Sequence, residues 1–187
     1  MLAINKGWPL AALLMSWAAL SGKADTGCSR CTIEVLFQGV YTDETCVVSI
    51  NGGSNIETVT LPTLAVSALS SAGDEAGAKD FAIALKDCPA DRKVSVTFIS
   101  NLAQADAATG NLVNASGENY SKNVQIRLRK EDGSQIAIDN AESGQEYFIP
   151  ATGEEVSHDY SAGYYAKTSG VTAGSVKAVA GIQLVYK

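Results

Sequence analysis

The chain ends in Gly174-Ser-Val-Lys-Ala-Val-Ala-Gly-Ile-Gln-Leu-Val-Tyr-Lys187, a stretch that alternates along its length. From position 176 onward every even-numbered residue is apolar: Val176, Ala178, Ala180, Ile182, Leu184 and Tyr186. A period of two predicts a β-strand with one apolar face. Two interpretations are open at this point. The stretch is an ordinary strand of a closed sandwich, or it borders a domain that its own residues do not close.

The same alternation recurs upstream and predicts an all-β chain. Turn signals separate the apolar runs, with Asn51-Gly-Gly53 after one run and Asp132-Gly133 inside a predicted hairpin. Only residues 66–79, rich in Ala and Ser, could hold a helical turn. Many short strands with Gly, Asn and Asp turns favour a β-sandwich. The extended segments expected before the last one are residues 32–41, 46–50, 58–61, 81–88, 94–98, 124–128, 136–138, 147–149 and 160–165.

Composition excludes several function classes. The 187 residues carry 14 Lys and Arg against 20 Asp and Glu, a net charge of −6, so we expect no nucleic-acid partner. The single histidine, His158, argues against a histidine-rich metal site and a histidine relay. Glu154 and Glu155 lie in a polar stretch flanked by glycine and are interpreted as a solvated turn. We therefore expect no enzyme, catalytic residue, metal or cofactor.

The N-terminus resembles an export signal. Residues 1–24 contain Lys6 and Lys23 but no acid, and an apolar run of about 12 residues follows Lys6. That run is too short to cross a bilayer. Cleavage is expected after Ala24, which delivers the chain to an oxidising compartment where cysteines pair.

The four cysteines form two sets. Cys46 and Cys88 stand at the start of one predicted strand and the end of another, 42 positions apart. Closing that loop contributes about 4 kcal/mol in the chain-entropy estimate. Cys28 and Cys31 would lie about 10 Å apart in an extended chain, beyond disulfide reach. A turn that lets them bridge is favoured, with unpaired thiols and pairing between chains left open.

Several spaced motifs together resemble chaperone–usher pilins of Gram-negative bacteria. Gly174 is the fourteenth residue from the end and Tyr186 is the penultimate one, as in the C-terminal signature of that family. Phe37-Gln-Gly39 before Cys46, and the residues from Phe81 to Cys88, are similar to its two cysteine motifs. Tyr160-Ser-Ala-Gly-Tyr-Tyr165 resembles its penultimate strand, and Cys46-Val-Val-Ser-Ile-Asn-Gly52 looks nearest to type 1 and type 3 major subunits.

The resemblance implies an incomplete immunoglobulin-like β-sandwich that lacks its last strand. Residues 25–41 would be an N-terminal donor-strand extension and residues 42–187 the pilin domain. Ile33, Val35, Phe37 and Gly39 would form the donor strand. The missing strand would leave a groove, and the donor strand of a neighbouring subunit or a strand of the chaperone would bind there. The edge of this groove comprises Gly174, Val176, Ala178, Ala180, Ile182, Leu184 and Tyr186.

The implied function is structural: polymerisation by donor-strand exchange in a fimbria that supports bacterial adhesion. The implied partners are identical or related subunits, a periplasmic chaperone and an outer-membrane usher, with passage through the periplasm to the cell surface. A minor or adaptor subunit at the tip, which contacts a receptor or adhesin, is the alternative.

The chain departs from the family pattern in its donor segment. The family has a Gly upstream of the Phe, whereas the same face here presents Val35, Ile33 and Cys31. If Val35-Leu36 is an insertion, Cys31 takes the place of that Gly. Residues 34–39 also resemble the recognition site of a picornaviral protease, and the sequence leaves open whether they are native or engineered.

Overall fold

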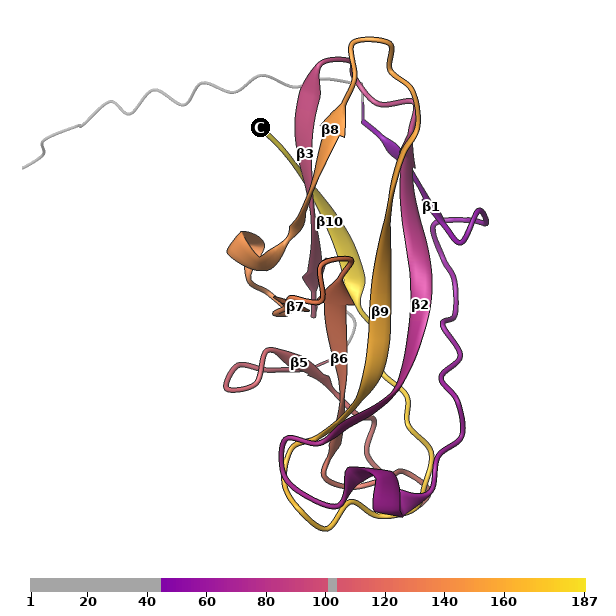
Figure 1. The fold of residues 1–187 in the computed structure, drawn as a ribbon, viewed down its shortest axis with the longest axis vertical. Coiled ribbons are helices and arrows are strands. Elements are labelled where there is room, and N and C mark those ends of the chain that lie inside the picture. Colours follow the sequence, from indigo (N-terminus) through magenta and orange to yellow (C-terminus); the bar gives the residue numbers. More distant parts are fainter. Residues whose placement is uncertain (1–44, 101–103) are drawn as a thin grey trace, which may run out of the picture. The chain divides into compact units, whose positions relative to one another are not determined.

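Two antiparallel sheets make up the described part of the chain, residues 45–100 and 104–187 of a computed structural model (Figure 1). The seven-stranded sheet has the order β1 (Val47–Ile50), β2 (Glu75–Lys86), β9 (Val156–Ala166), β6 (Val124–Lys130), β5 (Asn111–Val113) and β4 (Ala105–Asp106), with β7 (Gln135–Ile136) paired to β6. The three-stranded sheet has the order β10 (Gly181–Tyr186), β3 (Arg92–Ile99) and β8 (Gln145–Ile149). Single 3-10 turns occupy Val66–Leu69 and Ala141–Ser143.

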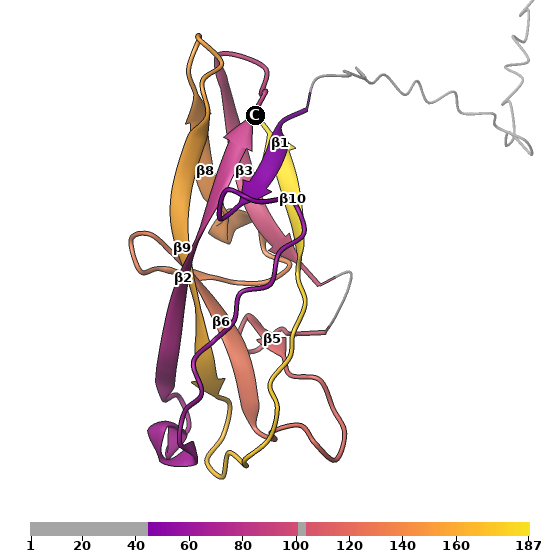
Figure 2. The same ribbon diagram turned by 90° about the vertical axis from the view of Figure 1, so that its right-hand side faces the viewer.

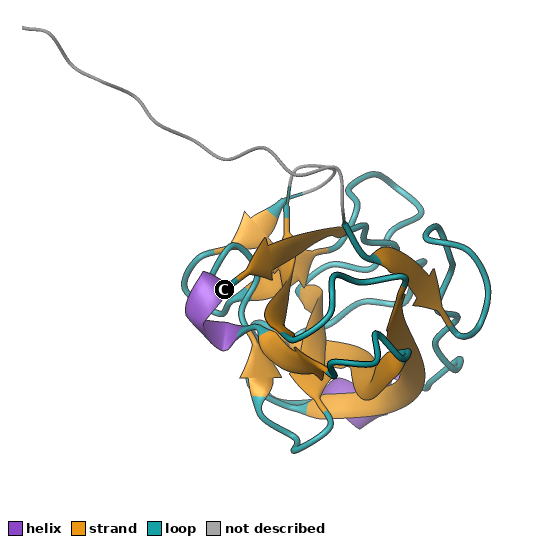
Figure 3. Ribbon diagram, turned by 90° about the horizontal axis from the view of Figure 1, so that it is seen from above, coloured by secondary structure: helices purple, strands orange, loops and turns teal. Residues whose placement is uncertain are grey.

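The core lies between the inner faces of these sheets, and the strands surround it when viewed from above (Figure 3). Alternation along the sequence explains which side chains reach the core, because successive residues of a strand face opposite sides. Ile83 and Leu85 of β2 and Val94 and Val96 of β3 have no exposed surface. The predicted apolar faces of residues 81–88, 94–98 and 124–128 are therefore confirmed.

Two buried tyrosines tie the sheets together across the core. The Tyr147 hydroxyl on β8 donates to the Ile83 carbonyl on β2 at 2.9 Å and lies 2.9 Å from the Tyr160 hydroxyl on β9. Burial raises the pKa of both hydroxyls, so both stay neutral donors and acceptors. Phe81 stacks on the Tyr160 ring at 5.5 Å between centroids. This buried polar cluster is thus satisfied and joins three strands.

Two sequence predictions are wrong in detail, and a third is confirmed. Residues 58–61 belong to no strand, and the last strand begins only at Gly181 rather than at 176. Both segments lack a neighbouring strand among the described residues, and alternation reports which side chains face the core, not whether a ladder exists. The helical turn expected within residues 66–79 is present. In residues 66–79 a single turn is followed by β2, which bulges between Ala76 and Lys79. Gly77 at this bulge has a φ of +65°, and a Cβ there would lie 2.8 Å from the Leu64 side chain.

Charged side chains pair on the outer face of the larger sheet. Arg127 and Arg129 of β6 both bond to Glu75 at the start of β2. Asp106 accepts a hydrogen bond from Lys167 at 2.6 Å and another from Gln125 at 2.7 Å. The Lys167 ammonium, followed by the Gln125 amide, holds the pKa of the Asp106 carboxyl at about 2. Asp106 therefore anchors the short edge formed by β4 and β5.

Replacing this carboxylate should lower stability in a pH-dependent way. Because the folded pKa of Asp106 lies below the unfolded value of about 3.9, its stabilisation is present above about pH 4 and disappears as the pH falls towards 2. We expect Asp106→Asn to cost about 1–2 kcal/mol at pH 7 and less than half of that at pH 2.5, where part of the stabilisation is already lost, measured by urea unfolding. Asp80→Asn, an exposed position on β2, serves as the control. An equal loss at both pH values would contradict this account.

Candidate functional site

β10 forms an open edge of the smaller sheet. It pairs with β3 on one side, from Gly181 opposite Ile99 to Tyr186 opposite Val94, and no described strand pairs with its other side. The Lys187 N–H donates to the Lys93 carbonyl at 2.9 Å, which places odd-numbered positions in hydrogen-bonded pairs with β3. The even-numbered positions of β10 therefore direct their backbone groups to the open side.

The segment before β10 continues this alternation without a ladder. A loop spanning residues 114–121 bonds to its odd-numbered positions instead. Ser175 donates its N–H to the Asn119 carbonyl at 2.8 Å, and the carbonyl of Lys177 accepts from Ala115 at 2.9 Å. The side of the chain that faces away from β3 and the 114–121 loop is therefore open from residue 175 to the end of β10. Within the described residues, no hydrogen bond satisfies the backbone groups of Val176, Ala178, Ala180, Ile182 and Leu184.

The same even-numbered positions carry an apolar row that is only half-buried. Their side chains pack against the core, whereas Lys177, Val179 and Gln183 between them are exposed. The edge thus combines unsatisfied backbone groups with uncovered apolar surface. Either feature alone is common at a sheet edge, but together they match what an added strand would cover.

The opposite wall of the opening comes from β1 and the chain that follows it. Val48 on β1 and Val59 and Leu61 beyond it are half-buried and pack against the core. Figure 2 shows this segment descending along the same side of the sandwich as β10 and the residues before it. The two segments border different sheets, and no described strand lies between them; we call the strip between them the groove.

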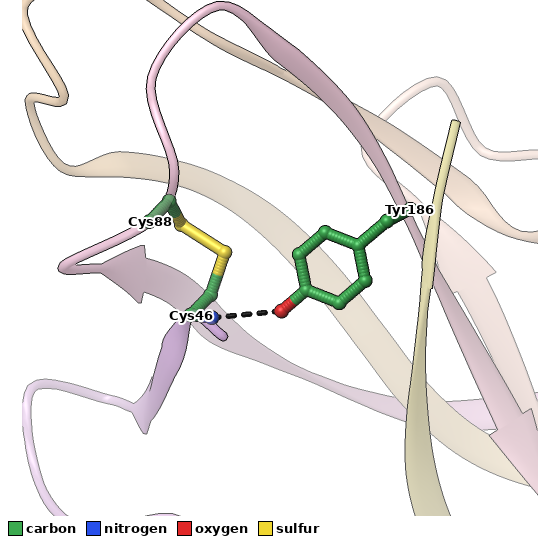
Figure 4. Close-up of a disulfide and its surroundings, with 3 residues drawn as sticks. All are labelled: Cys46, Cys88 and Tyr186. Carbon is green, nitrogen blue, oxygen red and sulfur yellow. Dashed lines mark hydrogen bonds between the residues drawn. A yellow bond between two sulfur atoms is a disulfide. The ribbon is translucent and has the colours of Figure 1, made fainter. Parts of the chain in front are cut away.

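One end of the groove is bridged beside a disulfide (Figure 4). Cys46 and Cys88 are joined, as expected, with their Cα atoms 4.1 Å apart. The Cys46 N–H donates to the Tyr186 hydroxyl at 2.7 Å. This bond links the start of β1 to the end of β10, and therefore links the two sheets where the groove ends.

The other end of the groove opens into a cavity of about 510 Å³ between residues 63–69 and 171–176. Its wall includes the apolar side chains of Leu64, Leu69 and Val176. Gly174 lies at this end with a φ of +154°, and a Cβ there would stand 2.5 Å from the Ser121 backbone nitrogen. Only glycine allows the edge and the 114–121 loop to approach so closely.

The structure brings the predicted groove residues into one line, from Gly174 to Tyr186. The predicted donor residues Ile33, Val35, Phe37 and Gly39 lie outside the described residues, as do Cys28, Cys31 and the domain boundary at residue 41. The sequence predictions did not include Asn114, which begins a match to the N-glycosylation motif, Asn114-Ala-Ser116, and is buried behind the edge. A buried amide has no sequence signal of its own.

Neither of the short helical turns in the described ranges is long enough to cross a membrane. Residues 45–100 and 104–187 also contain no group of three acidic, His or Cys side chains placed to hold a metal ion.

A family model described as fimbrial protein matches residues 35–187. The chain belongs to this family. It is 37% identical over 164 residues to the minor fimbrial subunit HifD of Haemophilus influenzae, covering 81% of this chain and 73% of that protein. It is 31% identical over 157 residues to the major fimbrial subunit SMF-1 of Stenotrophomonas maltophilia, covering 81% and 90%. Both major and minor subunits are thus among the relatives of this fimbrial subunit.

Solved structures identify the fold. The P pilus rod subunit PapA aligns over 82% of this fimbrial subunit and 99% of its own chain, with a TM-score of 0.53 and 20% identity. A subunit from a chaperone–usher pilus aligns over 86% and 99%, with a TM-score of 0.55 and 21% identity. The fold is the incomplete immunoglobulin-like sandwich expected from the sequence.

Removing the Tyr186 hydroxyl should loosen the bridged end of the groove. Tyr186→Phe leaves the buried Cys46 N–H without its acceptor, so we expect a loss of about 1 kcal/mol in the free energy of unfolding, measured in urea. Tyr165→Phe is the matched control, because the Tyr165 hydroxyl has no hydrogen bond to another described residue. Equal effects of the two substitutions would show that the bond to Cys46 contributes nothing.

Proposed function

We propose that this fimbrial subunit is a structural subunit that polymerises by donor-strand complementation. Residues 25–41 of one copy would enter the groove of the next, with Ile33, Val35 and Phe37 facing the core and Gly39 at the end of the donor strand. The observation that carries the proposal is the edge from Val176 to Leu184, where open backbone groups and half-buried apolar side chains coincide.

The lengths and energies are consistent with this assignment. The expected donor segment, residues 32–41, has 10 residues, and the open edge from 176 to 186 has 11. Three or four apolar side chains would contribute about 5–10 kcal/mol before the cost of ordering the segment. That range is comparable to the whole stability of a domain. A well-matched joint would therefore dissociate slowly.

The proposal includes the route that such a subunit takes. Residues 1–24 would direct export, and a periplasmic chaperone would cover the open edge until assembly at an outer-membrane usher. An uncovered edge of this kind is an aggregation hazard, which gives a physical reason for a covering partner. The assembled subunit would then lie in a fimbria at the surface of a Gram-negative cell.

Two complementary variants test the proposal. Phe37→Asp should disable the donor strand, and Ala180→Asp should place a charge in the groove. Each variant alone should stay monomeric, whereas an equimolar mixture should form dimers and stop, because only one functional donor and one functional groove remain. Mass photometry of the exported chain, residues 25–187, distinguishes these states.

Val179→Asp is the matched control for the groove variant. Val179 neighbours Ala180 but lies on the exposed side of the same segment, so this variant should assemble like the wild type. Polymers formed by either single variant, or equal effects of the substitutions at 179 and 180, would contradict the proposal.

A minor or adaptor subunit is the second candidate, favoured by the 37% identity to a minor subunit. In a shaft, the donor strand of each subunit must fit the groove of another copy of the same chain. An adaptor instead needs a donor strand and a groove that fit different neighbouring subunits. We expect the purified wild-type chain to form long filaments by itself in electron micrographs. Short oligomers that extend only when a second fimbrial subunit is added would favour the adaptor.

A further inference from the structure

The two halves of the groove edge are supported in different ways. The half from Gly181 to Tyr186 is backed by a regular ladder with β3. The half from Gly174 to Ala180 contains no strand and has one isolated bridge, between Ser175 and Tyr120. Its position therefore depends on the loop of residues 114–121 that lies behind it.

Asn114 makes the side-chain contacts between that loop and the edge. Its amide nitrogen donates to the Ser121 carbonyl at 2.8 Å and to the Ser175 carbonyl at 3.2 Å. Its amide oxygen accepts from the Lys177 N–H at 2.7 Å. The side chain is buried, with 9% of its surface exposed, and both amide hydrogens and the oxygen are used.

These contacts decide which way the edge faces. Because Ser175 and Lys177 are held from behind, Val176 and Ala178 between them present their backbone groups to the groove. Without the amide, the Lys177 N–H loses its partner, whereas the Ser175 carbonyl keeps only the hydrogen bond from the Ser121 N–H at 2.9 Å. The peptide group that ends in the Lys177 N–H can then turn towards water or the groove, which would disturb the alternating backbone groups to which an incoming strand bonds.

We propose that Asn114 is a positioning residue for strand capture, holding the first half of the groove edge in the conformation that an incoming β-strand requires. This inference rests on the proposed function, because it concerns how the same groove takes its strand. It assigns the buried asparagine a role different from that of a glycan acceptor, since its amide is occupied and enclosed.

The test uses the full exported chain as acceptor, carrying Phe37→Asp so that it cannot donate. The probe is a fluorescent peptide of residues 25–41 with Cys28→Ser and Cys31→Ser. Asn114→Ala should raise the peptide dissociation rate about tenfold or more. Asn119→Ala should leave the rate unchanged, because Asn119 contributes a backbone carbonyl that the substitution keeps.

Residue-resolved hydrogen exchange separates positioning from general destabilisation. On peptide binding, Asn114→Ala should lose amide protection at Ala178 and Ala180 while retaining it at Ile182 and Leu184. A uniform loss over both halves, or an unchanged dissociation rate, would overturn the inference. A wild-type groove that binds no peptide would instead overturn the proposed function, so the two failures are distinguishable.

Asn114→Asp keeps the inference testable if the alanine variant does not fold. The carboxylate can still accept from Lys177 but faces the carbonyls of Ser121 and Ser175 with no hydrogen to donate. Dissociation should be fast at pH 7 and slower near pH 4, where a protonated carboxyl donates one hydrogen bond. The parent acceptor should change less between the two pH values. A pH dependence equal to that of the parent would count against the role of the amide.

Discussion

The structure depends on one unmet requirement, a sheet edge whose backbone groups and apolar face both lack a partner among residues 45–100 and 104–187. Open edges are usually tolerated because the exposed side is polar or the strand is short. Here the edge extends from Val176 to Tyr186 and borders the hydrophobic core. The sandwich therefore has a core that its described residues only partly cover. This shortfall makes a strand supplied from elsewhere the natural way to complete the fold.

A groove of this kind must stay open without collapsing, and the contacts at its two ends serve that need. At one end the disulfide joins the start of β1 to the end of the neighbouring β2, and the bond from Cys46 to Tyr186 links that sheet to β10. At the other end, Gly174 permits close contact with the 114–121 loop. In the interior, the Tyr147 and Tyr160 hydroxyls hold three strands together on the side away from the opening. The rigid parts of the domain thus surround the part that is incomplete.

Much of this fold could be predicted from the sequence because alternation reports side-chain burial directly. The burial of Ile83, Val94 and Ile126 could be predicted in that way. The same pattern failed at residues 58–61, where Val59 and Leu61 do face the core but no neighbouring strand is present. Strand pairing is a property of two segments, so one segment cannot reveal that its partner is missing.

The 114–121 loop escaped prediction for a related reason. Asn is common in turns, and its usual interpretation is a solvated or locally bonded side chain. The partners of Asn114 are the backbones of Ser121 and Ser175, the latter 61 positions away, and only the folded chain brings them together. Every residue has a backbone carbonyl, so the type of the residue at position 121 or 175 does not indicate that it accepts this hydrogen bond. The sequence therefore marks neither Asn114 nor its partners. The glycine at position 174 is the exception, because close packing against the loop leaves no room for a side chain.

The unequal support of the two halves has a consequence for how a joint would resist force. Along β10, an added strand would extend a ladder already fixed by β3, so its hydrogen bonds would form against a rigid template. Along residues 174–180, the added strand would form the first ladder. The stability of that ladder would depend on the 114–121 loop, which supports this part of the edge through a few hydrogen bonds. The joint would then loosen first where the loop supports it and last beside β3. Both halves would contribute to the resistance to dissociation, and the loop half would be the one that a single substitution can weaken.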